Sequence, residues 1–149
     1  MKKILLIEDD GYLAAEIIGK LNNYDIKKAT SYNAAIGMWI DYSEDFECII
    51  LDLNIDPEGL ESKEREDYFS VPAILILLEF GKNKDGTAKS LEEQKAIWEK
   101  TVVFSDFIKN LPKEGFLKNP PGTLTYISKG DHITSVNELV KKVNEIVNK

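Results

Sequence analysis

Short, continuous runs of apolar residues alternate along the chain with longer stretches in which apolar positions recur every three or four residues. Continuous runs are typical of strands that are covered on both faces of a parallel sheet, and recurring positions are typical of amphipathic helices. On this basis we predict five strands, at residues 3–7, 25–29, 46–51, 101–104 and 124–128. A helical pattern follows nearly every one of them.

The helices are placed by their apolar spacing and by the residues that begin them. We expect helices over residues 12–21, after Ser31, over 70–80, over 90–98 and after Ser135. Ser90 and Glu93 have the spacing of a capping box, so Ser90 is expected to begin its helix. The same spacing joins Ser135 to Glu138 and predicts a helix start at Ser135. Residues 107–111 are compatible with one more short helix.

The segment 70–80 is strongly apolar and fits either a helix or a strand. We interpret it as a buried helix, because Ser70 suits a position near the N-cap and Pro72 is tolerated in a first turn. The alternative would make 73–78 the fourth strand. It is less favoured, because it puts a leucine at the strand end where the other placement puts Ser105.

The alternation of strands and helices predicts an α/β fold, with a doubly wound, five-stranded parallel sheet and five or six helices in one domain over residues 1–149. Sites in such folds lie at the carboxyl ends of the strands. The expected site is therefore formed by the residues that directly follow the strands.

Composition and charge narrow the classes of function. The length of 149 residues and the 43% hydrophobic content suit one globular domain that buries a core without disulfides. A net charge of −7 disfavours a nucleic-acid-binding surface, which needs clustered Lys and Arg. Cys48 is the only cysteine and His132 the only histidine, so a disulfide within the chain and zinc sites rich in these residues are excluded. Without a membrane-length apolar run or a leader pattern, a cytoplasmic protein is expected.

Polar residues stand at the predicted carboxyl ends of four strands: Glu8 and Asp9 after the first, Asp52 after the third, Ser105 after the fourth and Lys129 after the fifth. Carboxylates that lie close together repel one another unless a cation lies among them. Mg²⁺ suits such a cluster, because it binds through a few carboxylates and keeps waters for a phosphate. Three carboxylates, one Mg²⁺ and one lysine sum to zero charge.

Three motifs carry a resemblance to a known family. They are residues 4–10 (ILLIEDD), 49–54 (IILDLN) and 126–129 (YISK), with 43 residues from Asp9 to Asp52 and 24 from Ser105 to Lys129. These motifs and spacings resemble the receiver domain of bacterial response regulators, which has a CheY-like, flavodoxin-like fold. The resemblance covers nearly the whole chain outside residues 58–100, which form an expanded segment between the third and fourth strands.

The resemblance implies a phosphoryl-acceptor site. Asp52 would be the nucleophile that forms an aspartyl phosphate. Asp9, Asp52 and the backbone carbonyl of Asn54 would bind Mg²⁺, and Glu8 would hold a metal-bound water. Such a protein is a phosphorelay receiver that phosphorylates and dephosphorylates itself, rather than a turnover enzyme.

The resemblance also implies how the phosphoryl group is held and read out. Lys129 would pair with one phosphoryl oxygen, and the hydroxyl of Ser105 would hydrogen-bond another. Tyr126 would move inward together with Ser105 as the switch. The partners would be a histidine kinase or a phosphotransfer protein, and a downstream protein.

Two departures from the family's pattern favour an alternative function. Gly130 follows the lysine where the family usually has proline, and Asp106 follows Ser105 where a small residue is common. We expect the side chain of Asp106 to lie close to the phosphoryl site and to repel an incoming phosphodonor. The alternative is a degenerate receiver that acts as a phosphate-independent interaction module. A metal-dependent phosphohydrolase is a third possibility, but it would need a second aspartate where this chain has Asn54.

Overall fold

The computed structural model describes residues 1–42, 45–53, 55, 71–106, 120–130 and 132–149. Five strands form one sheet: β1 Lys3–Ile7, β2 Asp25–Ala29, β3 Phe46–Leu51, β4 Thr101–Phe104 and β5 Thr125–Ile127. Their order across the sheet is β2-β1-β3-β4-β5, and every neighbouring pair is parallel. The predicted α/β fold with a five-stranded parallel sheet is confirmed.

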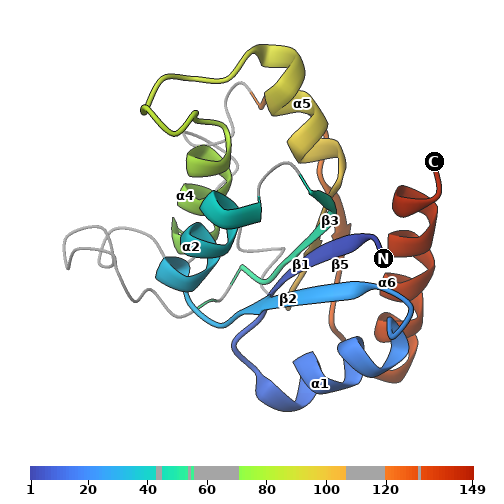
Figure 1. Ribbon diagram of the computed structural model, residues 1–149. Helices are drawn as coiled ribbons and strands as arrows, with labels where there is room; N and C mark the ends of the chain where they lie inside the picture. Colours follow the sequence, from blue (N-terminus) through green and yellow to red (C-terminus); the bar gives the residue numbers. More distant parts are fainter. Residues whose placement is uncertain (43–44, 54, 56–70, 107–119, 131) are drawn as a thin grey trace.

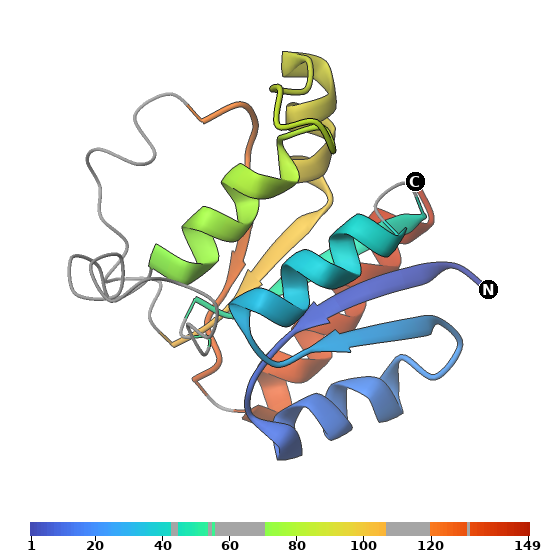
Figure 2. The ribbon, with the colours of Figure 1, turned by 60° about the vertical axis from the view of Figure 1, so that its left-hand side comes forward.

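Five helices in the described part of the chain cover the two faces of the sheet (Figure 1): α1 Gly11–Lys20, α2 Tyr32–Tyr42, α4 Val71–Phe80, α5 Leu91–Glu99 and α6 His132–Val147. Side chains of α2, α4 and α5 share one apolar core with the sheet, and those of α1 and α6 share the other. Figure 2 shows the same two layers after a turn of 60°. The central strands β1 and β3 are buried on both faces, which explains why their sequences are continuous apolar runs.

The ambiguous apolar segment is a helix, so the alternative placement of the fourth strand over 73–78 is wrong. Within α4, Ala73, Ile76, Leu77 and Phe80 are buried, and they lie at helical spacing. Leu78 is 44% exposed, so one face of the helix is covered rather than the whole of it. The predicted cap Ser70 and the predicted short helix at 107–111 lie outside the described residues.

The predicted start of the last helix is wrong. The helix α6 begins at His132, three residues before Ser135. Ser135 is buried, and its hydroxyl donates a hydrogen bond of 2.6 Å to the carbonyl oxygen of Lys129. The serine therefore ties the first turn of the helix to the end of β5 instead of capping the helix from outside. At α5 the predicted cap is confirmed, since Ser90 accepts from the amide of Glu93.

The two tryptophans and the cysteine lie in the apolar interior. Trp39 and Trp98 are core residues, and Cys48 is fully buried at the centre of the sheet. Burial raises the pKa of the Cys48 thiol to about 12, which keeps it protonated and unreactive. Among the helices that the structure describes, none is long and apolar enough to cross a membrane.

Candidate functional site

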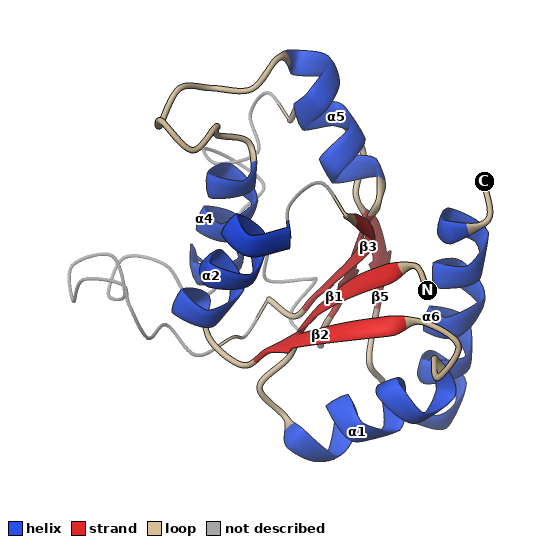
Figure 3. Cartoon of the chain, in the orientation of Figure 1, coloured by secondary structure: helices blue, strands red, loops and turns tan. Residues whose placement is uncertain are grey.

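The candidate site lies where the parallel strands end, and the register of the sheet brings its residues together. Ile7 pairs with Leu51, so the residues that follow them, Glu8 and Asp52, stand at the ends of adjacent strands. The amide of Asp52 donates to the carbonyl of Ile7 (3.0 Å), and the amide of Glu8 donates to the carbonyl of Ala29 (3.0 Å). The backbones of both residues are thus still hydrogen-bonded to the neighbouring strands, which fixes where their side chains begin. Figure 3 shows the strands from which they come.

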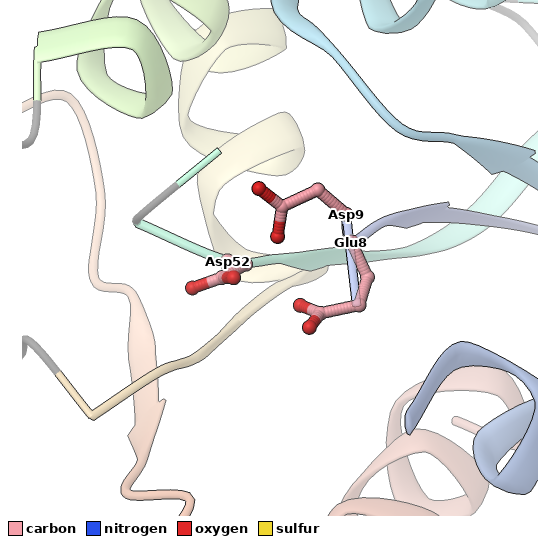
Figure 4. A group of neighbouring side chains, drawn as sticks. All are labelled: Glu8, Asp9 and Asp52. Atoms are coloured by element: carbon pink, nitrogen blue, oxygen red, sulfur yellow. The ribbon is translucent and has the colours of Figure 1, made fainter. Parts of the chain in front are cut away.

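Three carboxylates meet at this edge (Figure 4). Glu8, Asp9 and Asp52 each offer one oxygen atom, and these atoms all lie within 4.8 Å of one another. Glu8 is 2% exposed and Asp52 is 4% exposed, whereas Asp9 is exposed. Two buried carboxylates and one exposed carboxylate thus form a cluster of negative charge that meets solvent at Asp9.

Lys129 is the cation of the site. Its Nζ donates to both carboxylate oxygens of Glu8, at 2.8 and 3.1 Å, and to Oδ2 of Asp52 at 3.2 Å. It lies 5.8 Å from the centroid of the ring of Phe104, the last residue of β4. Burial alone lowers the pKa of Lys129, but the hydrogen bond to Glu8 and the charges of Asp52 and Glu8 outweigh it, so the pKa is raised. The lysine stays charged.

Glu8 is the most perturbed carboxyl group of the site. Its pKa is raised to about 8, first by burial and then by the charge of Asp52, while Lys129 acts in the opposite direction. When all three carboxylates are ionised, one ammonium leaves two negative charges unbalanced. The donor set is hard oxygen only, and its unbalanced charge equals that of a divalent cation, so the residues present fit Mg²⁺.

Ser105 follows β4 and is fully buried. Its amide donates to the carbonyl of Ile127 (3.2 Å), and its own carbonyl accepts from the amide of Lys129 at 3.4 Å. These bonds hold the ends of β4 and β5 together, so that a hydroxyl and an ammonium stand at neighbouring strand ends. The ring of Tyr126, on β5, is 41% exposed. Burial of its phenol raises the pKa of Tyr126.

Comparison with solved structures identifies the fold. A receiver domain of a response regulator from Clostridium thermocellum aligns over 99% of this chain and 95% of its own, with a TM-score of 0.61 and 16% identity. The receiver domain of the Francisella response regulator 1452 aligns over 99% and 98%, with a TM-score of 0.61 and 20% identity. The chain has the fold of a response regulator receiver domain.

A third receiver-fold structure was solved with a metal and a phosphoryl analogue. The response regulator TrrA from Thermotoga maritima, in complex with Mg²⁺ and BeF, covers 96% of this chain and 99% of its own, at a TM-score of 0.58 and 18% identity. Neither the protein-family models nor the curated protein sequences give a match to this chain. Its receiver fold is therefore recognised from the three-dimensional structure and from its motifs, at low overall identity.

Asp106 makes a hydrogen bond that the sequence did not predict. Its Oδ1 accepts a hydrogen bond of 3.0 Å from the amide of Gly130, and the side chain is exposed. It is not one of the three carboxylates that gather at the strand ends. The hydrogen bond joins the residue after Ser105 to the residue after Lys129. A proline at position 130 would have no N–H to donate, so the two departures from the receiver pattern are complementary.

Sequence reasoning missed this hydrogen bond, although its signal was present in the chain. Gly130 has a φ of +24°, and no cis peptide bond occurs among the described residues. Glycine permits this backbone conformation, and its amide donates to the side chain of Asp106, the residue after Ser105. The side chain of Asp106 therefore holds the loop that contains Gly130. The structure brings together Glu8, Asp9, Asp52, Ser105 and Lys129 as expected. Asn54 lies outside the described residues.

Proposed function

We propose that this protein is a phosphorelay receiver that accepts a phosphoryl group on Asp52. One observation carries the proposal: a nearly buried aspartate at the carboxyl end of a central strand, within 4.8 Å of two further carboxylates and 3.2 Å from a lysine ammonium. A carboxylate in that position is a nucleophile, and its neighbours are the groups that a phosphoryl dianion needs for charge balance. The receiver fold supports the same conclusion.

The proposed reaction moves one phosphoryl group. A carboxylate oxygen of Asp52 forms a bond to phosphorus, while the bond from phosphorus to a histidine nitrogen of the donor breaks. The bonding electron pair stays on that nitrogen, which then takes a proton. Lys129 would bind one oxygen of the transferred group and Ser105 would donate to another, so two residues on neighbouring strands hold the product in place.

The carboxylates would hold Mg²⁺ through Asp9 and Asp52, with the backbone carbonyl of Asn54 as a further ligand and Glu8 on a metal-bound water. When bound, the ion neutralises the negative charge that would otherwise oppose the phosphodonor. Asp9 is the exposed carboxylate, which gives an ion a path from solvent. The structure of TrrA with Mg²⁺ and BeF supports this assignment by analogy of fold.

The proposed partners follow from the chemistry. A histidine kinase or a phosphotransfer protein would supply the phosphoryl group in the cytoplasm, and a downstream protein would recognise the phosphorylated form. Tyr126 is a candidate for the side chain that reports the state of Asp52, because it opens the YISK motif, three residues before Lys129, and its side chain is partly exposed. The protein would act as a signalling switch rather than a turnover enzyme.

Intact-mass analysis tests the proposal directly. The protein is treated with acetyl phosphate with and without Mg²⁺, and beryllofluoride serves as a second, non-covalent probe. We expect the mass of one added phosphoryl group only when Mg²⁺ is present, and no gain in Asp52→Asn. Asp9→Asn should lose both the labelling and the affinity for Mg²⁺, because it removes one of few direct ligands. Unchanged Mg²⁺ affinity in both variants would overturn the site assignment.

A second candidate function is a receiver fold that works as a phosphate-independent interaction module. The ion pairs of Lys129 favour it, because the ammonium already binds Glu8 through two oxygens and Asp52 through a third. In such a module the lysine would stay paired with these two carboxylates and would not be needed to hold a phosphoryl group. The labelling experiment separates the two functions, since an interaction module would gain no mass at any Mg²⁺ concentration.

A further inference from the structure

A cavity lined by several lysines lies between α2 and the loop that joins α4 to α5, and none of the residues of the carboxylate cluster lines it. Its volume is about 420 Å³, which lies within the range of small-molecule sites. We call it the lysine pocket. Its lining includes three apolar residues of α2 and three lysines: Ile36, Trp39, Ile40, Lys82, Lys84 and Lys89. Glu79 is its one carboxylate, so three ammonium groups and one carboxylate give the lining a charge of +2 in a chain whose net charge is −7.

The loop that carries the three lysines is held by its own hydrogen bonds. The amide of Lys89 donates to the carbonyl of Gly81 (2.8 Å), and the amide of Asn83 donates to the carbonyl of Thr87 (2.7 Å). Lys82 forms a β-bridge with Ala88 between these two bonds. Gln94, on α5, donates to the carbonyl of Lys89 (2.8 Å) and anchors the loop to the helix. The lysines are therefore presented by a preformed structure, which reduces the entropy lost when a ligand binds.

The charges of the lysines are only partly balanced. Lys82 pairs closely with Glu79 at 2.8 Å. The side chain of Lys89 is only 19% exposed, yet its nearest carboxylate, on Glu93, is 3.9 Å away and its contact with the amide oxygen of Asn83 is 3.5 Å. No carboxylate in the described part of the chain lies within ion-pair distance of Lys84. Two lysines thus leave most of their charge for a ligand.

The opposite wall of the lysine pocket is apolar and belongs to α2. Ile36, Trp39 and Ile40 line it, and Ile40 is 52% exposed. Helices α2 and α4 run side by side (Figures 1 and 2), and Trp39 stacks on Phe80 with ring centroids 4.1 Å apart. Ammonium groups on one side and apolar carbon on the other suit a ligand with both characters.

We propose that the lysine pocket binds a small organic phosphate, with the phosphate between Lys84 and Lys89 and the apolar part of the ligand against Ile36 and Ile40. Lysine binds phosphate as a compact point charge with three donors, and a dianion cancels the +2 charge of the lining. The apolar wall explains why an ester should bind better than inorganic phosphate. This site is separate from Asp52 and takes no part in the proposed phosphoryl transfer.

Fluorescence of Trp39 gives a direct test. The chain has two tryptophans, so Trp98→Phe leaves Trp39 as the only indole. Phenyl phosphate, inorganic phosphate and phenol are titrated without divalent ions, which keeps phosphate away from the carboxylate cluster. We expect a saturable change with phenyl phosphate, a weaker one with inorganic phosphate by about tenfold, and none with phenol over the same range.

Matched variants decide which surface binds. Lys84→Gln combined with Lys89→Gln should weaken phenyl phosphate by at least about tenfold, because two charge-assisted contacts are lost. Lys141→Gln combined with Lys142→Gln, on α6, removes the same charge elsewhere and should leave binding unchanged. Asp52→Asn should bind as well as the parent protein, whether or not Asp52 is a phosphoryl acceptor. Equal loss in both lysine pairs, or a response that does not saturate, would overturn the proposal.

Discussion

Glu8 combines two roles at the residue scale, as a partner of Lys129 and as a carboxylate beside Asp52. Burial raises its pKa to about 8, with a further contribution from the charge of Asp52. Near neutral pH the metal-free site therefore retains a proton on Glu8 in a large share of molecules. A cation that enters the cluster favours the ionised form and must displace that proton.

Binding of Mg²⁺ should consequently depend on pH. Because the ionised form of Glu8 suits the ion, affinity should rise as the pH is raised from 6 towards 8 and level off above 8. The slope should approach about tenfold per pH unit for one proton released. Titration calorimetry in two buffers of different ionisation enthalpy measures both the affinity and the proton count.

Glu8→Gln is the control for the pH dependence of Mg²⁺ binding. It removes the titrating carboxyl group but keeps a polar side chain of the same shape. The variant should bind Mg²⁺ with an affinity that changes little between pH 6 and 8. A dependence as steep as that of the parent protein would assign the proton to another group.

Asp106 can influence phosphoryl transfer through its charge or through its hydrogen bond to Gly130. Asp106→Asn removes the charge and keeps an oxygen that can accept from the amide, whereas Asp106→Ala removes both. If charge repulsion controls the rate, both variants should label Asp52 faster by about tenfold, which corresponds to about 1.4 kcal/mol. Rates are measured by intact mass with acetyl phosphate. Acceleration in Asp106→Ala alone would mean that the hydrogen bond, and not the charge, limits the reaction.

At the scale of elements, two serines near helix starts have different roles, because one lies just before its helix and the other lies within it. Ser90 precedes α5, accepts from the amide of Glu93 (3.1 Å) and donates to its carboxylate (3.1 Å). Ser135 lies within the first turns of α6 and donates to the carbonyl of Lys129. The first stabilises a helix at the surface, and the second joins a helix to the candidate site.

Alanine at these two positions should therefore have different consequences. Ser90→Ala should lower the free energy of unfolding by about 1 kcal/mol, the usual cost of losing an N-cap, and leave labelling of Asp52 unchanged. Ser135→Ala should cost about 1–2 kcal/mol, because a buried acceptor loses its donor, and should also slow the labelling. Urea unfolding and intact-mass kinetics measure the two effects. Equal labelling rates in both variants would show that the link to Lys129 has no functional role.

At the scale of the whole molecule, two apolar cores lie on either side of one sheet, and Cys48 belongs to the core that the sheet shares with α1 and α6. It is fully buried on β3, a strand that pairs on both edges. Access to its sulfur requires the core beneath α1 and α6 to open, which in a small α/β fold is close to global unfolding.

Cys48 should therefore report the global stability of the protein. In the native state its alkylation should be slower than that of the unfolded chain by several orders of magnitude, in proportion to the fraction of open molecules. Mg²⁺ with beryllofluoride should slow it further, because a ligand that binds only the folded state stabilises that state. The rate is followed by mass spectrometry with iodoacetamide. Rapid alkylation of the folded protein would contradict the placement of Cys48.

Much of the fold and the site could be predicted from the sequence, because parallel strands share a carboxyl edge. Apolar runs that form parallel strands bring the residues after them to one edge, and the structure places Glu8, Asp9, Asp52, Ser105 and Lys129 there. Their roles in phosphoryl transfer stay predictions. The residues that flank segment 70–80 predict a helix, and the structure has one over Val71–Phe80. The strand ends and this helix depend on local sequence pattern, so they could be predicted from the sequence alone.

Only the tertiary structure decided features that depend on burial or on the paths of loops. Lys129 and Glu8 are 121 residues apart, and nothing in the sequence shows that Glu8 receives two of the lysine's three contacts. The pKa of Glu8 reflects the low dielectric around it, which arises only after the cores have packed. The hydrogen bond from Gly130 to Asp106, the early start of α6 and the lysine pocket depend on where loops run over the folded surface. Spacing along a chain does not encode those paths, because a loop of given length can close in many ways.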